Sequence, residues 1–321
     1  MNHSSAVRLN LSPIRSDYHI HTSFSADSSA SMDAQIQAAI AAGLESICFT
    51  EHVDLDSPFR NVPEGDPESN FRIDYEQYLQ TYLEKKDEYA GRIRLLFGLE
   101  LGLNTAYVQE LLDYVSSHPD FDFIIGSTHS ARDGMDPYYA DFFDPAPVSA
   151  AEQYASRSRG HIFTDSSEEF DPYHSYFEAA LDNVRTFCRQ NLFDTYGHLD
   201  YILRCGPLCA DGSCPERTST FFYEKYSDLI DPLLQELIQH SKALEVNTSP
   251  LKKGFPETNP GKAVLCRYYE LGGRLITIGS DAHVPDAVAY GFDRAAALLK
   301  ECGFDRYVTY EQRRPKWHKF D

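Results

Sequence analysis

Histidine and acidic residues of this chain recur in short motifs whose spacing suits the binding of a metal ion. His19 and His21 stand two residues apart in DYHIH, and Asp281 and His283 repeat that spacing in GSDAH. Side chains two residues apart point to the same side of a β-strand, so each pair can reach a single ion. Imidazole and carboxylate ligands together suit zinc, iron and manganese, and the two motifs therefore predict metal binding.

Further candidate ligands stand singly behind short apolar runs. They are His52 in FTEH, Glu100 in FGLE, His129 in GSTH, His198 in YGHLD and Asn247 in LEVN. A single histidine in such a place is more often a hydrogen-bonded loop residue than a metal ligand. The same coincidence after each successive run favours one shared site, and the number of donors favours more than one metal ion.

Motifs of other catalytic classes are missing from the sequence. It contains no G-x-S-x-G nucleophile motif, no P-loop and no G-x-G-x-x-G fingerprint. Cys205, Cys209 and Cys214 lie close together in CGPLCADGSC, but a zinc knuckle would require a fourth ligand and usually a Cys-x-x-Cys pair. A turn-rich loop is the better interpretation of that segment, with the zinc knuckle as the alternative.

The apolar runs in front of the polar residues have the pattern of strands in a parallel sheet. They cover residues 14–20, 46–50, 93–99, 121–126, 194–197, 243–247 and 274–279. Their nearly continuous apolar character is typical of strands that are buried on both faces. Helical patterns separate them, at residues 33–42, 74–89, 104–115, 176–188, 221–238 and 286–299. Asn259 and Pro260 predict the N-cap and first residue of one more helix, which ends at Gly272.

The polar residues at the strand ends decide between the possible α/β architectures. In these folds, sites form at the carboxyl ends of the strands. An open sheet would hold its outer strands too far from a common centre, whereas a closed barrel brings all the ends together. We therefore expect a single (β/α)7 barrel domain over residues 1–321. A long polar stretch, at about residues 130–173, interrupts the alternation and is expected to form a lid over the site.

Composition limits the partners and the location of the protein. The formal net charge is −20, which disfavours binding to nucleic acid or to an anionic membrane surface. A small phosphorylated substrate stays compatible, because a local cluster of cations can override the mean charge. The chain shows no apolar run of about 18 residues, and we expect no secretory leader. The 7 cysteines are unevenly spaced, and we expect reduced thiols in a cytoplasmic protein.

The motifs, taken in order, resemble those of a known superfamily. DYHIHTSFSADS, FTEH, GLEL, GSTHS, GHLDYI, LEVNTSPL and GSDAH are similar to the motifs of the PHP (polymerase and histidinol phosphatase) superfamily. The strings H-x-H-T-x-F-S-x-D-S and EVNTS point to its histidinol-phosphate phosphatase branch. The resemblance spans about residues 15–290. It implies the PHP fold, a distorted (β/α)7 TIM-like barrel, with three divalent metal ions that are zinc, iron or manganese.

By position, the resemblance also implies which residues hold each ion. The first ion would take His19, His21, Glu100 and Asp281. The second would share Glu100 and add His129 and His198. The third would take Asp27, His52 and His283. Of these residues, Glu100, His129, His198 and Asp281 are expected to be catalytic.

The branch implies a phosphate monoester hydrolase of histidine biosynthesis. It would convert L-histidinol phosphate to L-histidinol and phosphate, with a hydroxide that bridges two metal ions attacking phosphorus. Arg204, Asn247 and His161 are expected to contact the substrate, and Asp200 either orients a histidine or caps a turn. The alternatives are a PHP phosphoesterase for another small phosphorylated compound or nucleotide, and a non-catalytic metal-binding protein. The acidity of the chain opposes a nuclease, and its oligomeric state stays open.

Overall fold

The structure is a computed structural model that describes residues 12–55, 71–129, 172–204 and 219–320. Of the expected lid at 130–173, only residues 172 and 173 fall within these ranges. His161 and the CGPLCADGSC segment lie outside the described residues, so the structure does not test the lid or the zinc knuckle.

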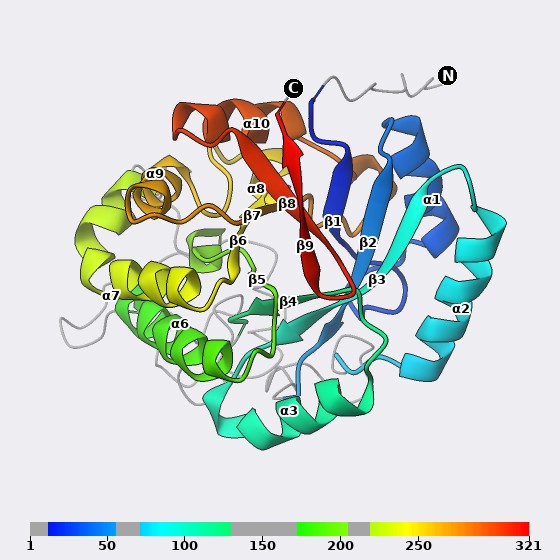
Figure 1. Cartoon of the computed structure of the whole chain (residues 1–321), viewed down its shortest axis with the longest axis horizontal. Coiled ribbons are helices and arrows are strands. Elements are labelled where there is room, and N and C mark those ends of the chain that lie inside the picture. Colours follow the sequence, from blue (N-terminus) through cyan, green and yellow to red (C-terminus); the bar gives the residue numbers. More distant parts are fainter. Residues whose placement is uncertain (1–11, 56–70, 130–171, 205–218, 321) are drawn as a thin grey trace, which may run out of the picture.

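Seven parallel strands form the central sheet and follow one another in chain order (Figure 1). They are β1 Ser16–Ile20, β2 Ser46–Val53, β3 Arg94–Gly102, β4 Phe123–Ser127, β5 Thr195–Tyr196, β6 Ala243–Asn247 and β7 Ile276–Gly279. Just beyond the outer strands, the backbone N–H of His21 donates to the carbonyl of Ala282 at 3.0 Å, so the two sheet edges meet. The predicted barrel is therefore confirmed.

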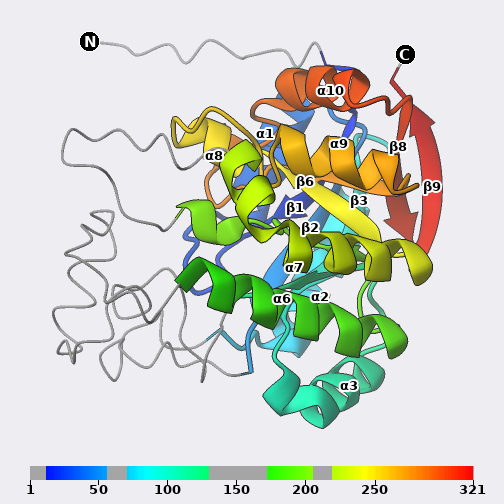
Figure 2. The ribbon, with the colours of Figure 1, turned by 90° about the vertical axis from the view of Figure 1, so that its left-hand side faces the viewer.

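Helices surround the barrel on its outer side (Figures 1 and 2). They are α1 Met32–Ala41, α2 Tyr75–Glu88, α3 Val108–Ser117, α6 Pro172–Arg189, α7 Ser219–Gln239, α9 Lys262–Glu270 and α10 Phe292–Glu301. Shorter turns are η2 Thr105–Tyr107, η3 Tyr201–Arg204, α8 Ser249–Lys252 and η4 Pro285–Ala287. Side-chain caps fix two of the starts, because Ser31 accepts from the N–H of Ala34 and Asp74 from that of Gln77.

Two predicted helix starts are wrong. Asn259 and Asn247 exchange backbone hydrogen bonds of 2.8 and 2.9 Å, so Asn259 pairs with β6 instead of capping a helix, and α9 begins at Lys262. The helix predicted from residue 286 begins at Phe292, because Gly291 adopts a left-handed conformation with φ 74°. That conformation favours glycine and interrupts a right-handed helix.

A hairpin that the sequence pattern did not reveal closes the amino-terminal end of the barrel. It consists of β8 Arg306–Glu311 and β9 Arg314–Lys319, drawn in red across the strands in Figure 1. The hydroxyl of Tyr18 donates to the carbonyl of Tyr310 at 2.9 Å, and Arg313 pairs with Asp194 at 2.8 Å. Figure 2 shows the hairpin at one end of the barrel and α8 at the other. The hairpin therefore does not cover the carboxyl ends of the strands, where a functional site can form.

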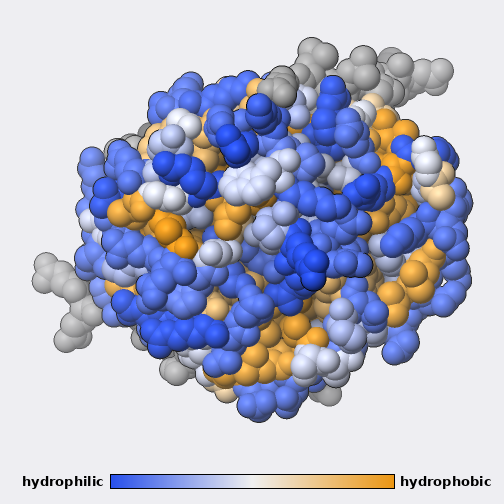
Figure 3. All heavy atoms as spheres, viewed as in Figure 1, coloured by the Kyte–Doolittle hydropathy of each residue, from blue (hydrophilic) through white to orange (hydrophobic). Residues whose placement is uncertain are grey.

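Hydrophilic side chains predominate on the face that carries the hairpin (Figure 3). Beneath it, Val308 and Tyr310 pack inside the barrel with Cys48, Leu96 and Phe123. Cys48 precedes His52 by four residues in β2, and Leu96 precedes Glu100 by four residues in β3. Side chains an even number of residues apart point to the same side of a strand, so His52 and Glu100 also point into the barrel.

Within the part of the chain that the structure describes, no helix has the length and hydrophobicity to cross a membrane.

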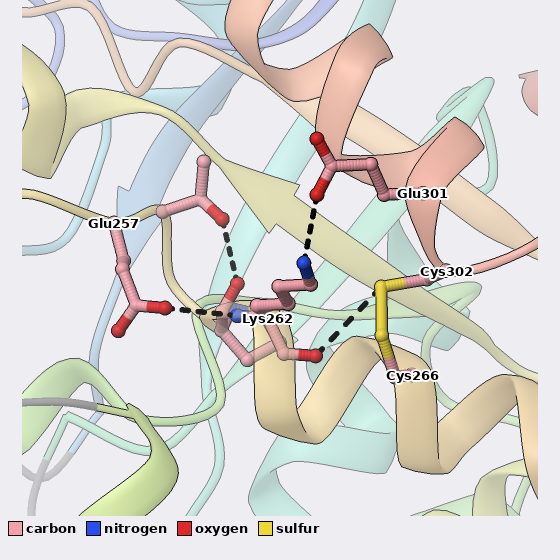
Figure 4. The surroundings of a disulfide bond; sticks show 7 residues. Glu257, Lys262, Cys266, Glu301 and Cys302 are labelled. Carbon is pink, nitrogen blue, oxygen red and sulfur yellow. Dashed lines mark hydrogen bonds and ion pairs between the residues drawn. A yellow bond between two sulfur atoms is a disulfide. The ribbon is translucent and has the colours of Figure 1, made fainter.

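The expectation of uniformly reduced thiols is wrong, because Cys266 and Cys302 form a disulfide (Figure 4). Cys266 lies in α9 and Cys302 follows the last residue of α10, and their Cα atoms are 4.6 Å apart. Packing of the two helices brings together cysteines that are 36 residues apart in sequence, within the range that a disulfide requires. Cys48 and Cys188 are buried free thiols.

Candidate metal centre

Glu100, near the end of β3, lies at the centre of the predicted ligands. Its side chain is fully buried, with histidine nitrogens beside both carboxylate oxygens. Oε1 lies 2.9 Å from Nε2 of His198 and 3.1 Å from Nε2 of His129. Oε2 lies 2.9 Å from Nε2 of His19 and 3.3 Å from Nε2 of His21. A carboxylate placed in this way can be shared between two metal ions.

Asp281 completes the first group of donors. Its Oδ1 lies 3.7 Å from Nε2 of His19 and 3.5 Å from Nε2 of His21. Ligand atoms that hold one ion tetrahedrally at 2.0–2.2 Å are separated by about 3.3–3.6 Å. The spacing of these donors around Glu100 is close to that requirement, so His19, His21, Glu100 and Asp281 can surround one ion with little movement.

Asp281 and His283 converge for a reason that the sequence pattern did not predict. Asp281 has a left-handed backbone with φ 52°, so the chain has left the strand and the alternation of side chains no longer applies. Nδ1 of His283 nevertheless lies 3.4 Å from Oδ1 of Asp281. The prediction that the two side chains share a site is therefore consistent with the structure, but the turn after β7 brings them together.

Asp27, His52 and His283 form the outer edge of the centre. Oδ2 of Asp27 lies 2.9 Å from Nε2 of His283 and 3.6 Å from Nε2 of His52. The ring of His21 stacks on both histidines, with centroids 4.2 Å from His52 and 4.3 Å from His283. The Asp27 side chain is 34% exposed, whereas Glu100 is fully buried. The centre therefore opens towards solvent on the side of Asp27.

Buried negative charge dominates the electrostatics of the centre. Burial opposes protonation of His19, but the carboxylates of Glu245 and Glu100 raise its pKa well above the ordinary value. Burial and the neighbouring His21 lower the pKa of His52 to about 4. Burial alone would raise the pKa of Glu100, yet the surrounding histidines hold it well below its usual range. The cationic groups beside Glu100 therefore favour its ionised form.

A set of acidic residues behind the histidines was missed by the sequence analysis. Oε1 of Glu245 lies 2.5 Å from Nδ1 of His19, and Oδ1 of Asp54 lies 2.9 Å from Nδ1 of His129. Both carboxylates are buried. Their spacing in the sequence could have revealed them. Glu245 stands two residues before Asn247, and Asp54 stands two residues after His52. Because side chains two residues apart point to the same side of a strand, Glu245 lies on the interior face of β6 and Asp54 lies just beyond the interior face of β2.

A third acidic residue, Glu51, acts on the centre through a serine. The Ser25 hydroxyl donates its proton to Oε2 of Glu51 at 2.6 Å, because an ionised carboxylate can only accept. At 3.1 Å from Nδ1 of His21, the same hydroxyl must therefore accept from that ring. Nδ1 of His21 thus carries a proton, and Nε2 is the nitrogen that can bind a cation.

The donor set fits metal ions on a further observation. Nε2 of His21 and Nδ1 of His52 are buried and lie 3.3 and 3.2 Å from Oε2 of Glu100, but neither makes a hydrogen bond of suitable geometry among the described residues. Buried polar atoms are normally satisfied, so these two are candidates for bonds to a cation. Within the described residues, four overlapping groups of histidines, three of them with an acidic residue, have ligand atoms close enough to hold an ion. Their mixed imidazole and carboxylate chemistry suits zinc, iron or manganese.

Asn247 lies beside the centre with its amide already engaged. Its Nδ2 donates to Oδ2 of Asp281 at 3.2 Å and to Oε2 of Glu245 at 3.3 Å. Its Oδ1 accepts from the backbone N–H of Ser249 at 3.0 Å. These bonds orient Asp281. A contact between Asn247 and the substrate stays a prediction.

Two other predicted residues have different outcomes. Asp200 caps a turn: its carboxylate accepts from Nδ2 of Asn259 at 2.6 Å and from the N–H of Gly261 at 3.3 Å. Burial raises the pKa of Asp200 to about 7. The alternative role, in which it orients a histidine, is not supported. Arg204 is the last residue of η3, and its side chain lies outside what the structure describes.

Comparisons with known proteins agree with this geometry. A family model described as the PHP domain matches residues 17–249. The curated histidinol-phosphatase of Lactococcus lactis subsp. lactis is 30% identical over 92% of this chain and 93% of its own length. A probable histidinol-phosphatase of Clostridium acetobutylicum is 28% identical over 94% of this chain and 98% of its own.

A solved structure is similar over nearly the whole chain. It is the crystal structure of histidinol phosphate phosphatase from Lactococcus lactis subsp. lactis in complex with zinc, L-histidinol and phosphate. The TM-score is 0.72 and the sequence identity is 26%. The similarity covers 94% of this chain and 98% of the other.

Proposed function

Since this chain belongs to the PHP domain family, we propose that it is a metal-dependent histidinol-phosphatase that hydrolyses L-histidinol phosphate to L-histidinol and phosphate. The observation that carries the proposal is the position of Glu100, a buried carboxylate with histidine nitrogens within 3.3 Å of both oxygens. A similar chain, 26% identical, has been crystallised with zinc, histidinol and phosphate.

The proposal includes three groups of metal ligands. The first consists of His19, His21, Glu100 and Asp281, and the second of Glu100, His129 and His198. The third consists of Asp27, His52 and His283. The distances within each group, 2.9–3.7 Å where they are given above, are compatible with these groups, and the 3.4 Å between Asp281 and His283 shows that the first and third groups adjoin.

The residues of the chain have separate tasks in the proposed reaction. Divalent ions held in the centre would supply Lewis acidity, which activates water and neutralises charge on the phosphoryl oxygens. Glu100 would contribute ligand oxygens to two of these ions. Glu245 and the Glu51–Ser25 pair hold the rings of His19 and His21 in place before substrate arrives. Such preorganisation matters because donors that are already oriented need not rearrange during the reaction.

Several parts of the proposal rest on sequence alone. Substrate contacts by Arg204, His161 and Asn247 stay predictions, as do the lid at 130–173 and a single domain over residues 1–321. We also propose a cytoplasmic location, because the enzyme would consume a phosphorylated intermediate of amino-acid biosynthesis.

Metal analysis combined with steady-state kinetics tests the function. The purified protein, loaded with zinc or manganese, would be assayed on L-histidinol phosphate and on a panel of other phosphate monoesters, including nucleotides. We expect the highest kcat/KM for histidinol phosphate. A higher value for another monoester would replace the proposed substrate, and a fully metal-loaded protein that hydrolyses none of them would refute the enzymatic assignment.

A further inference from the structure

Asp54 follows the last residue of β2 and lies between two histidines that belong to different groups of metal ligands. Its side chain is 3% exposed. Oδ1 lies 2.9 Å from Nδ1 of His129, and Oδ2 lies 3.8 Å from Nδ1 of His52. We propose that Asp54 is a positioning residue that holds the His129 ring for metal binding, and that Gly102 is glycine because Asp54 must occupy the space beside it. This inference rests on the metal centre of the proposed function.

The hydrogen bond to His129 determines which nitrogen faces the centre. A carboxylate oxygen is an acceptor, so Nδ1–H of His129 donates the hydrogen bond to Oδ1 of Asp54 and keeps its proton. Nε2 then points at Oε1 of Glu100, 3.1 Å away. Without a partner on Nδ1, the ring could rotate or adopt the other tautomer, and Nε2 would no longer be held toward the metal position.

Gly102 supplies the independent observation. A Cβ at this position would lie 1.6 Å from Oδ1 and 2.7 Å from Cγ of Asp54, which no side chain can tolerate. In the paired strands, His52 lies opposite Glu100 and Val53 opposite Leu101, so Asp54 continues the register beside Gly102. The three heavy atoms nearest to that Cβ all belong to Asp54, so the space that Gly102 leaves open is filled by this one side chain.

Two further contacts show that the position of Asp54 is built into the fold. Its backbone N–H donates to the carbonyl of Phe71 at 2.9 Å, which fixes the chain as it leaves β2. Oδ2 of Asp54 and Nδ1 of His52 are both buried and have no hydrogen-bond partner within the described ranges. The second oxygen lies 3.8 Å from Nδ1 of His52, a ligand of the third proposed ion, while the first holds His129, a ligand of the second.

The first test replaces Asp54 and measures metal binding and the His129 ring directly. In Asp54→Ala we expect metal affinity to fall about 10–100-fold, with fewer ions retained per chain. Ring ¹⁵N chemical shifts, assigned with His129→Gln, should show Nδ1–H in the unaltered protein and a mixture of tautomers in Asp54→Ala. Asp54→Asn keeps an acceptor oxygen at this position, so it should largely preserve the Nδ1–H tautomer.

The second test changes Gly102 and leaves every proposed ligand intact. Gly102→Ala should displace the Asp54 carboxylate and reproduce the loss of metal and the mixed tautomers of Asp54→Ala. Leu101→Ala is the matched control, because Leu101 is buried in the core between sheet and helices. It should lower the melting temperature without changing metal content.

The outcomes separate this inference from the proposed function. Wild-type metal content and an unchanged His129 tautomer in both Asp54→Ala and Gly102→Ala would overturn the positioning role, whatever the substrate is. Failure of the metal-loaded, unaltered protein to hydrolyse histidinol phosphate would overturn the proposed function and leave the metal measurements on Asp54 standing.

Discussion

Oε1 of Glu245 lies 2.5 Å from Nδ1 of His19, and both side chains are buried inside the barrel. The other oxygen, Oε2, accepts from the backbone N–H of His198 at 2.8 Å. One carboxylate on β6 therefore connects the end of β1 with the segment after β5. It sets the direction of His19 in the first group of ligands and the backbone of His198 in the second.

Glu245→Gln is expected to weaken metal binding at the first position. The amide keeps the size of the side chain but removes the charge that stabilises the Nδ1–H form of His19. Loss of such a partner typically costs about 10–100-fold in metal affinity or activity. Zinc titration in competition with a chromophoric chelator measures the affinity. Glu110→Gln, on the exposed face of α3, is the control, and equal affinities in the two variants would contradict the role of Glu245.

His129→Ala is expected to lower kcat by about 10²–10³-fold, the magnitude found when a major electrostatic group of an active site is removed. The second ion would lose a ligand, while the substitution leaves the barrel core intact. Steady-state kinetics gives kcat, and circular dichroism with thermal melting shows whether the variant is folded. His240→Ala, at the end of α7 and away from the centre, should retain full activity. Normal turnover in a folded His129→Ala protein would refute the assignment of the second ion.

Removal of the metal ions is expected to abolish activity and to lower stability. A ligand at 100 times its dissociation constant stabilises the folded state by about 2.7 kcal/mol, and the apo-protein loses that contribution for each ion. Dialysis against a chelator, followed by thermal melting and assay, measures both effects. Zinc, manganese and iron(II) are then added back singly to identify the ion that restores turnover. Full activity in a protein shown to be free of metal would contradict the proposal.

Reduction of the Cys266–Cys302 disulfide is expected to lower the melting temperature and to leave kcat unchanged. The bond joins α9 to the end of α10, on the outside of the barrel, and none of the proposed ligands lies in these helices. A disulfide that closes a loop of this length contributes about 2–4 kcal/mol. Thermal melting with and without reductant measures the effect, and Cys266→Ala should melt like the reduced protein. Equal melting temperatures under both conditions would show that the bond does not stabilise the protein.

The sequence by itself determined the barrel and the proposed ligands at the strand ends. Apolar runs that end in histidine or acidic residues are local patterns, and the carboxyl ends of parallel strands meet at one place in a closed barrel. Glu100 and His129 could be assigned to the centre for this reason, without knowledge of any distance. The same local rule failed for Asp281, where a left-handed residue replaces the strand geometry.

Tertiary structure alone decided how the ligands are held and which end of the barrel is closed. Glu245 and His19 are 226 residues apart in sequence, and Tyr310 and Tyr18 are 292 apart. No periodicity in the chain predicts such pairs, because a hydrogen bond requires two atoms at a set distance and angle after the whole barrel has closed. Contacts of this kind determine which nitrogen of His19 and of His129 carries a proton. They also determine the space that Gly102 leaves for Asp54 and the position of the β8–β9 hairpin at the amino-terminal end of the barrel.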